Sequence, residues 1–285
     1  MSFNLKVINY PNGSCQIRYY SKALVTKDDM SVSEVSEISD KVSAKERYEN
    51  QFVLNPFTDS WDMVDYSGSD GEVDSDHKDS GRLKRSLNRS KQKIYEHARS
   101  LKWEWFVTFT FNPEKVDSYN YDECSRVLRE WLKYYKKNYA PDLKYLVIPE
   151  LHQSGRWHFH GVLFNLGNIA LTYHGLSYGK HVYNMPVYDY GFSTVTKVSD
   201  VFRVSHYICK YITKDLLSAL PGKQCYYVSK GLPKPDTFVL SFVRKEENLL
   251  EYVENYAASL GKTLQHVTSI GDDISYTKTT YFELG

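Results

Sequence analysis

Residues 143–164 decide the fold, with "LKYLVIPE" at 143–150 and "SGRWHFHGVLF" at 154–164. Both runs are rich in apolar, aromatic and β-branched residues, and Ser154-Gly155 between them is a turn signal. The two runs are therefore predicted to pair as an antiparallel hairpin. Because side chains alternate between the faces of a strand, His158 and His160 are expected on one face. A tight turn brings Glu150 roughly opposite His158, although the sequence alone does not fix the register.

Two imidazoles and one carboxylate that converge in this way suit a divalent cation. The set leaves coordination positions open for substrate and water, and it favours Mg²⁺ or Mn²⁺, although zinc would also accept it. The alternative is a pair of strand histidines satisfied by hydrogen bonds. Only a second motif elsewhere in the chain can decide between these two interpretations.

The composition sets broad limits on the class of protein. The chain has 285 residues, 41% of them hydrophobic, and a net charge of only +1, so it can bury one large core or two without being basic overall. Four scattered cysteines form no C-x-x-C pair and indicate free thiols in a reducing compartment. There is no signal peptide and no run of about 20 apolar residues, which predicts a soluble cytoplasmic protein without a membrane partner.

Charge is distributed unevenly along the first 102 residues. Residues 27–80 contain 15 acidic and 5 basic side chains, whereas residues 81–102 contain 8 basic and 1 acidic. The basic block is predicted to form a cationic helix that binds a phosphate backbone, although a solvated helix would have the same composition. The candidate DNA-binding residues are Arg82, Lys84, Arg85, Arg89, Lys91 and Lys93.

Other segments give a coarse order of elements. A hairpin is expected at 4–20 with its turn at Asn12-Gly13, followed by a mobile acidic linker at 66–81. Strands are expected at 105–113 and 191–198, and an amphipathic helix at 121–139. The Gly- and Tyr-rich stretch at 166–186 is expected to be irregular.

A second motif follows in "SHYICKYITKDLL", residues 205–217. A helix over this segment would place Tyr207 and Tyr211, four residues apart, on one face, with Lys210 and Lys214 in a neighbouring stripe. The β-branched residues between them weaken helix propensity, so tertiary packing must hold the helix. The alternative is a buried Tyr/Ile stripe with exposed lysines. His206 points elsewhere on this helix and is expected to be structural.

The segments "FVTFTF", "GRWHFHGVLF" and "YICKYITK", in this order, resemble the three motifs of rolling-circle replication initiators of the His-hydrophobe-His endonuclease superfamily. The doubled tyrosine is most similar to the initiators of small single-stranded DNA phages and related plasmids. The resemblance covers roughly residues 85–235, including the trailing "SKGLPKP".

The resemblance implies an α+β fold in which a central antiparallel sheet of about five strands is flanked by helices, in a ferredoxin- or RRM-like arrangement. It makes His158 and His160 metal ligands on a central strand, with Glu150 as the third ligand and His152 as its competitor. Three segments are expected: residues 1–80 with a small β extension and the acidic segment, residues 81–235 as the endonuclease domain, and residues 236–285 as a mixed α/β extension.

The expected activity is metal-dependent nicking and strand transfer on a single-stranded DNA origin, through a 5′-phosphotyrosine on Tyr207 or Tyr211. Lys210 and Lys214 would hold the phosphate or stabilise the phenolate. The chain lacks a G-x-x-x-x-G-K-[ST] motif, so a separate helicase and polymerase, supplied by a prokaryotic host of the phage or plasmid, are expected partners. The alternatives are a transposase or relaxase with the same chemistry, and a non-catalytic DNA-binding repressor.

Overall fold

A computed structural model describes residues 2–25, 52–54, 61–63, 77–242, 248–272 and 277–285. The chain divides into two compact units, one formed by residues 1–51 with 234–285 and the other by residues 52–233. Both contain antiparallel sheets and helices, so the expected α+β class is confirmed. The four cysteines are free thiols. The expected linker at 66–81 lies largely outside the described residues.

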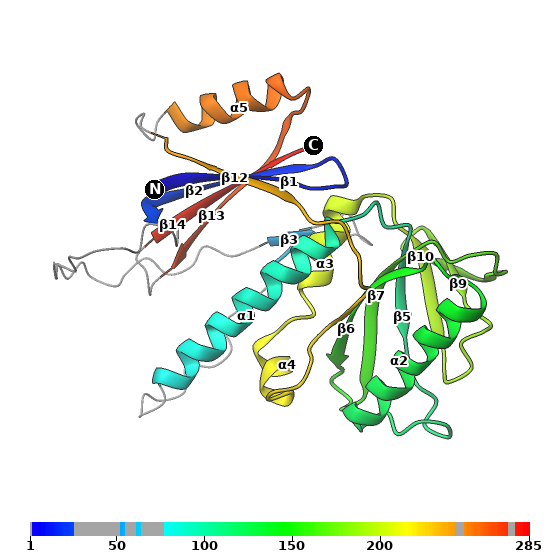
Figure 1. The fold of residues 1–285 in the computed structure, drawn as a ribbon. Helices are drawn as coiled ribbons and strands as arrows, with labels where there is room; N and C mark the ends of the chain where they lie inside the picture. Colours follow the sequence, from blue (N-terminus) through cyan, green and yellow to red (C-terminus); the bar gives the residue numbers. More distant parts are fainter. Residues whose placement is uncertain (1, 26–51, 55–60, 64–76, 243–247, 273–276) are drawn as a thin grey trace. The chain divides into compact units, whose positions relative to one another are not determined.

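The larger unit is built on a seven-stranded antiparallel sheet, two strands more than the expected core of about five (Figure 1). Two of its inner strands, β6 and β7, are the hairpin predicted around Ser154-Gly155. In spatial order the strands are β11 (Tyr227–Val228), β6 (Lys144–Leu151), β7 (Trp157–Phe164), β5 (Trp105–Phe109), β10 (Ser193–Lys197), β9 (Lys180–Asn184) and β8 (Thr172–Ser177). A separate short pair joins β3 (Phe52–Leu54) to β4 (Trp61–Met63).

Helices cover both faces of this sheet because its central strands bury both. On one face, Phe109 of β5 packs edge-on against Trp131 of α2 (Tyr121–Asn138). On the other face, Phe106 of β5 packs against Tyr207 of α3 (Val201–Cys209). The remaining helices are α1 (His77–Ala98) and α4 (Lys214–Ala219), and Figure 1 shows α2 on one side of the strands and α1, α3 and α4 on the other.

The β6–β7 hairpin has the predicted turn and a defined register. Glu150 pairs directly with His158, and the backbone N–H of Gly155 donates to the carbonyl of His152 at 2.8 Å. Gly155 has φ +80°, a left-handed conformation that glycine adopts without steric cost. Farther along β7, a Cβ added at Gly161 would lie 2.6 Å from the carbonyl oxygen of Leu146, so only glycine lets the two backbones approach there.

One stretch expected to be irregular is regular. Within residues 166–186, β8 and β9 form a hairpin at the sheet edge, joined by Tyr178 (φ 48°) and Gly179 (φ 74°). Two successive positive φ values are the geometry of a type I′ turn, which matches the twist of the flanking strands. The prediction failed because a tyrosine occupies a turn position that Asn or Asp usually fills.

The smaller unit joins the two ends of the chain in one five-stranded sheet. The predicted hairpin at 4–20 is present as β1 (Ser2–Asn9) and β2 (Cys15–Val25), with Gly13 at φ +90° in its turn. The chain thus divides differently from the three successive segments expected, because residues 236–285 complete this sheet instead of forming a separate extension. They supply β12 (Asp236–Leu240), β13 (Leu264–Asp272), β14 (Thr277–Leu284) and the helix α5 (Leu249–Ser259), which packs on one face.

Candidate functional site

The residues predicted to hold a metal converge on one face of the larger sheet. Glu150 comes from β6 and His158 and His160 from β7, and one ligand atom of each lies within 4.8 Å of the other two. Nε2 of His160 is 2.6 Å from a carboxylate oxygen of Glu150. We call these three residues the Glu150–His158–His160 cluster.

Thr108 of β5 holds the second nitrogen of one imidazole. Its hydroxyl Oγ1 lies 3.0 Å from Nδ1 of His160, directly across the β5–β7 pairing. With Nδ1 engaged, Nε2 is the nitrogen directed at Glu150 and available to a cation. The donor set of two imidazoles and one carboxylate, with one imidazole oriented in this way, fits a divalent cation.

Electrostatics favours the deprotonated form of this cluster. Burial raises the pKa of Glu150, but the hydrogen bond from His160 and the positive charges of the nearby imidazoles and of Lys210 outweigh it and lower the pKa of the carboxyl group overall. Burial, and the neighbouring imidazole of His160, lower the pKa of His158. A carboxylate and a neutral imidazole are the forms that bind metals.

His152, the competing third ligand, does not belong to the cluster. Its ring stacks on that of His158 at 5.1 Å between centroids, but its Nδ1 lies 2.9 Å from Oγ of Ser154 within the turn. Among the described residues, the group able to hold a metal contains Glu150 instead. The register of the hairpin explains this choice, because it puts Glu150 beside the two histidines and His152 in the exposed turn.

The two tyrosines lie at the end of α3, not on one continuous helix. The helix expected over 205–217 ends at Cys209, and Tyr211 follows in a turn. The Tyr211 hydroxyl nevertheless donates to that of Tyr207 at 3.0 Å, and the Tyr211 ring stacks on His160 with centroids 4.0 Å apart and planes 6° apart. Both phenols therefore adjoin the Glu150–His158–His160 cluster.

Burial keeps the phenol that stacks on His160 protonated. Tyr207 is 7% exposed and Tyr211 6%, so neither side chain faces open solvent. Burial, reinforced by the adjacent Tyr207 hydroxyl, raises the pKa of Tyr211 well above its ordinary value. A phosphate could reach the hydroxyls only after the rings or the turn that carries Tyr211 had moved.

Of the two lysines, one lies at this site. Nζ of Lys210 is 3.8 Å from the centroid of the Tyr207 ring and 5.2 Å from that of Tyr211, which is cation–π geometry. Lys214 does not extend this stripe, because it begins α4, a separate helix. The Thr213 hydroxyl marks the start of that helix, since it accepts from the backbone N–H of Leu216 and so caps α4.

His206 has the structural environment that was expected. Its Nδ1 lies 3.0 Å from the carbonyl oxygen of Phe202, and its ring packs on those of Phe202 and Tyr95. It therefore helps to join α3 to α1 and does not enter the cluster.

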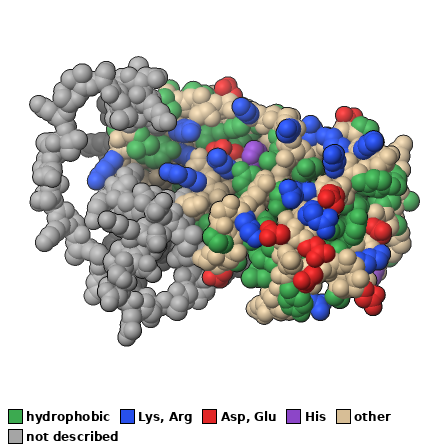
Figure 2. Space-filling model, turned by 60° about the horizontal axis from the view of Figure 1, so that its bottom comes forward, with side chains coloured by type: hydrophobic (Ala, Val, Ile, Leu, Met, Phe, Trp, Pro, Cys, Tyr) green, Lys and Arg blue, Asp and Glu red, His purple; other side chains and the backbone are tan. Residues whose placement is uncertain are grey.

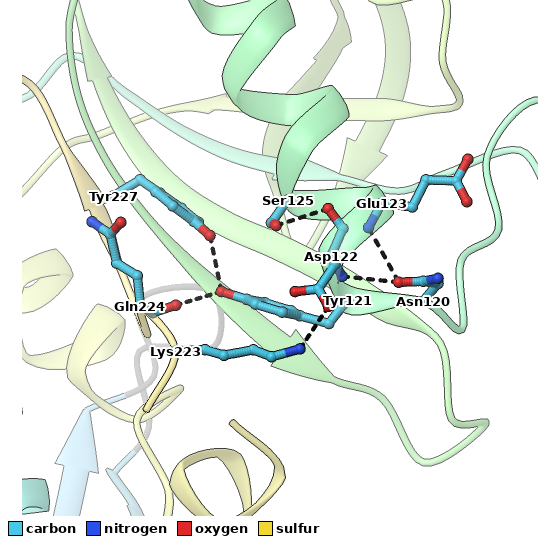
Figure 3. A network of polar contacts seen from close by, with 8 residues as sticks. All are labelled: Asn120, Tyr121, Asp122, Glu123, Ser125, Lys223, Gln224 and Tyr227. Atoms are coloured by element: carbon cyan, nitrogen blue, oxygen red, sulfur yellow. Dashed lines mark hydrogen bonds and ion pairs between the residues drawn. The ribbon is translucent and has the colours of Figure 1, made fainter. Parts of the chain in front are cut away.

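A polar network fastens the segment after α4 to the start of α2 (Figure 3). The Tyr121 hydroxyl donates to the carbonyl of Gln224 and lies 2.9 Å from the Tyr227 hydroxyl. Nζ of Lys223 forms an ion pair with Asp122 at 2.7 Å. Burial, together with the bond to Tyr227, raises the pKa of Tyr121, which keeps it a neutral hydrogen-bonding group. These contacts anchor the chain that follows the tyrosine-bearing segment.

The basic block forms part of α1, as expected. Arg89 and Lys93 are exposed and Lys91 is half-buried, whereas the side chains of Arg82, Lys84 and Arg85 lie outside the described ones. On the face in view, Figure 2 shows Lys and Arg side chains interspersed with acidic and apolar ones. Among the described helices, none is long and apolar enough to span a membrane.

Sequence reasoning missed Thr108, Tyr119 and Arg156 near the cluster. Thr108 carries a signal that was available, because period-2 alternation in "FVTFTF" gives it a face opposite to that of Val107 and Phe109. Its pairing with His160 depends on the order of strands in the sheet, which the local sequence does not contain.

Fold and site together define an α+β protein in which two imidazoles, a carboxylate and two phenols meet on one face of an antiparallel sheet. Residues 104–216 match a family model for replication-associated proteins of the ORF2 type. The match contains the cluster and both tyrosines, and it supports a replication-associated protein. No curated protein and no solved structure matches the chain significantly.

Proposed function

We propose that this chain initiates rolling-circle DNA replication by nicking a single-stranded origin and transferring the strand through a 5′-phosphotyrosine. The observation that carries the proposal is the stack of Tyr211 on His160, which brings a pair of phenols against a candidate metal cluster inside the matched region. A phage or plasmid in a prokaryotic cell would encode such a protein, and the host would supply the helicase and polymerase.

The cluster residues would bind and orient the scissile phosphodiester. Glu150, His158 and His160 would hold Mg²⁺ or Mn²⁺, which when bound would draw charge from the phosphate oxygens and favour in-line attack. Thr108 would keep the His160 ring in the required orientation through Nδ1. The low pKa of Glu150 keeps its carboxylate ionised at neutral pH.

A tyrosine would supply the nucleophile. In the cleavage step a bond forms between the phenol oxygen and phosphorus, the bond from phosphorus to the 3′ oxygen breaks, and the phenol proton leaves while the 3′ oxygen gains one. The Lys210 ammonium, 3.8 Å from the Tyr207 ring centroid, would stabilise negative charge that develops on the phenol oxygen. The released 3′-hydroxyl would be a primer for the polymerase.

Two adjacent tyrosines would serve two successive cuts. While one carries the covalent strand, the other could attack the regenerated origin, and the freed 3′ end could then resolve the first adduct and close a circle. The hydroxyls are 3.0 Å apart, so both could reach the same phosphate. Since both rings are buried, this function requires that DNA binding opens the stack on His160.

The deciding experiment is a search for the covalent adduct. The full chain is incubated with end-labelled single-stranded origin DNA of its own replicon and Mn²⁺, and the products are separated under denaturing conditions. A labelled protein band that protease removes and EDTA prevents is expected. His158→Ala and His160→Ala should lose the adduct but keep DNA binding, because binding draws on many phosphate contacts.

The outcomes separate this proposal from its alternatives. Adduct formation with transposon ends or a transfer origin, and not with a replication origin, would assign the same chemistry to a transposase or relaxase. DNA binding with no adduct under any metal would leave a repressor. Full cleavage in EDTA would refute the role of the metal.

A further inference from the structure

An exposed aromatic and a cation meet at the tip of the β6–β7 hairpin. Nε of Arg156 donates to the Tyr119 hydroxyl at 3.3 Å, and the guanidinium carbon lies 5.6 Å from the centroid of the Tyr119 ring. The ring runs along the turn, where a Cβ added at Gly155 would lie 3.5 Å from two of its atoms. We call these two side chains the Tyr119–Arg156 pair.

The backbone beneath the pair is fixed, although the side chains are exposed. The N–H of Trp157 donates to the carbonyl of Ser118 at 2.7 Å, and the Tyr119 N–H donates to the Asp117 carboxylate at 3.0 Å. Tyr119 is still 57% exposed. Within the described part of the chain, no carboxylate forms an ion pair with Arg156, so its charge is available to an anion.

The pair continues the line of the candidate metal ligands. Arg156, His158 and His160 are spaced by two along the chain, so they project from the same side, with successive side chains about 7 Å apart. The His152 ring, stacked on His158 at 5.1 Å, fills the space at the turn between them. A strand held at the cluster would therefore extend over His152 toward the Tyr119–Arg156 pair.

We infer that the Tyr119–Arg156 pair binds single-stranded DNA immediately beside the scissile phosphodiester, with Arg156 on a backbone phosphate and Tyr119 stacked on an unpaired base. The location beside a scissile bond rests on the proposed function, whereas binding to the pair does not. A single strand fits better than a duplex because an exposed ring can stack only on a base whose face is free. Guanidinium is the side chain best suited to a phosphate.

The test is a binding measurement that needs no cleavage. The affinity of the full chain for a fluorescein-labelled oligothymidylate of about 20 nucleotides is measured by anisotropy in EDTA over a range of salt. Arg156→Gln is expected to flatten the log–log salt dependence by about 0.7, the value for one single-strand phosphate contact. Tyr119→Leu is expected to weaken binding on the order of tenfold with an unchanged slope.

Two matched variants control for general effects on the surface. Arg126→Gln removes an exposed arginine from α2, and Tyr134→Leu removes a tyrosine that is 54% exposed on the same helix. Neither should alter affinity or slope. With 4-thiothymidine in the oligonucleotide, photocrosslinks should map to the peptide that contains Tyr119 or to the β6–β7 turn.

The results distinguish this inference from the proposed function. If Arg156→Gln and Tyr119→Leu bind like their controls, or if they weaken only duplex binding, the inference is wrong. If they weaken oligothymidylate binding but no covalent adduct ever forms, the nicking proposal fails and the binding site stands.

Discussion

Replacing Thr108 with valine tests whether the His160 imidazole is oriented for metal binding. Valine has nearly the same shape as threonine, so Thr108→Val removes the 3.0 Å contact to Nδ1 of His160 without opening a cavity. Loss of such an orienting contact costs about 10- to 100-fold in metal affinity, or about 1.4–2.8 kcal/mol of binding free energy. We expect the dissociation constant for Mn²⁺ to rise by this factor.

The assay is titration of the full chain with Mn²⁺, followed by the electron paramagnetic resonance signal of the free ion. Thr108→Ser keeps a hydroxyl and should retain most of the affinity. Thr110→Val is the matched control, because the Thr110 hydroxyl donates to the carbonyl of Phe192 and not to the cluster. Equal Mn²⁺ affinities for Thr108→Val and Thr110→Val would refute the orienting role of Thr108.

Three further predictions concern the tyrosines, the pH dependence and the basic helix. Tyr207→Phe and Tyr211→Phe should each still nick a single-stranded origin but lose circle formation, and only the double variant should be inert. One inactive and one fully active single variant would instead indicate a single working tyrosine. Mn²⁺ affinity should fall as pH drops below about 6.5, because His158, whose pKa is lowered, must stay neutral, and it should fall again when Glu150 is protonated. The lowered pKa of His158 also means that the unfolded chain takes up its proton first, so the free energy of unfolding should decrease over the same window; an affinity constant from pH 7 to 5 would contradict the assigned ligands. Joint neutralisation of four basic residues of α1 should flatten the salt dependence of DNA binding by about 0.7–0.9 per lost phosphate contact, whereas an unchanged slope would give the helix another role. These four residues are Arg82, Lys84, Arg85 and Arg89.

The sequence predicted those parts of the fold that depend on local periodicity and turn chemistry. Alternation with period 2 put His158 and His160 on one face, and Ser154-Gly155 located the reversal that pairs Glu150 with His158. The spacing of apolar residues gave α2 almost to its ends, where Asn120 caps its first turn. Such signals are strong because each lies within a few residues of the structure it specifies.

The failed predictions also have local causes, which compete with the dominant pattern. The helix over 205–217 splits because the Thr213 side chain caps a new helix, with Asp215 in its first turn. A threonine followed by a lysine and an aspartate was the available signal for this start. The β8–β9 hairpin was missed because Tyr178 adopts a positive φ that the sequence gives no reason to expect.

Contacts between distant segments were decided only by the tertiary structure. The sequence left Glu150 and His152 as competing ligands, and the strand register and the turn separated them, bringing Glu150 into the cluster. The meeting of the Tyr211 ring with His160 likewise depends on how α3 and its following turn pack on the sheet.

By itself, then, the sequence determined which residues share a face of a strand or helix, because the backbone repeat is fixed by covalent geometry and hydrogen bonding. It did not determine that residues 236–285 complete the sheet begun by residues 2–25, or that Thr108 orients His160. Those pairings follow from burying complementary surfaces of segments far apart in the chain. Their free energy belongs to the assembled core, and no local window of residues contains it.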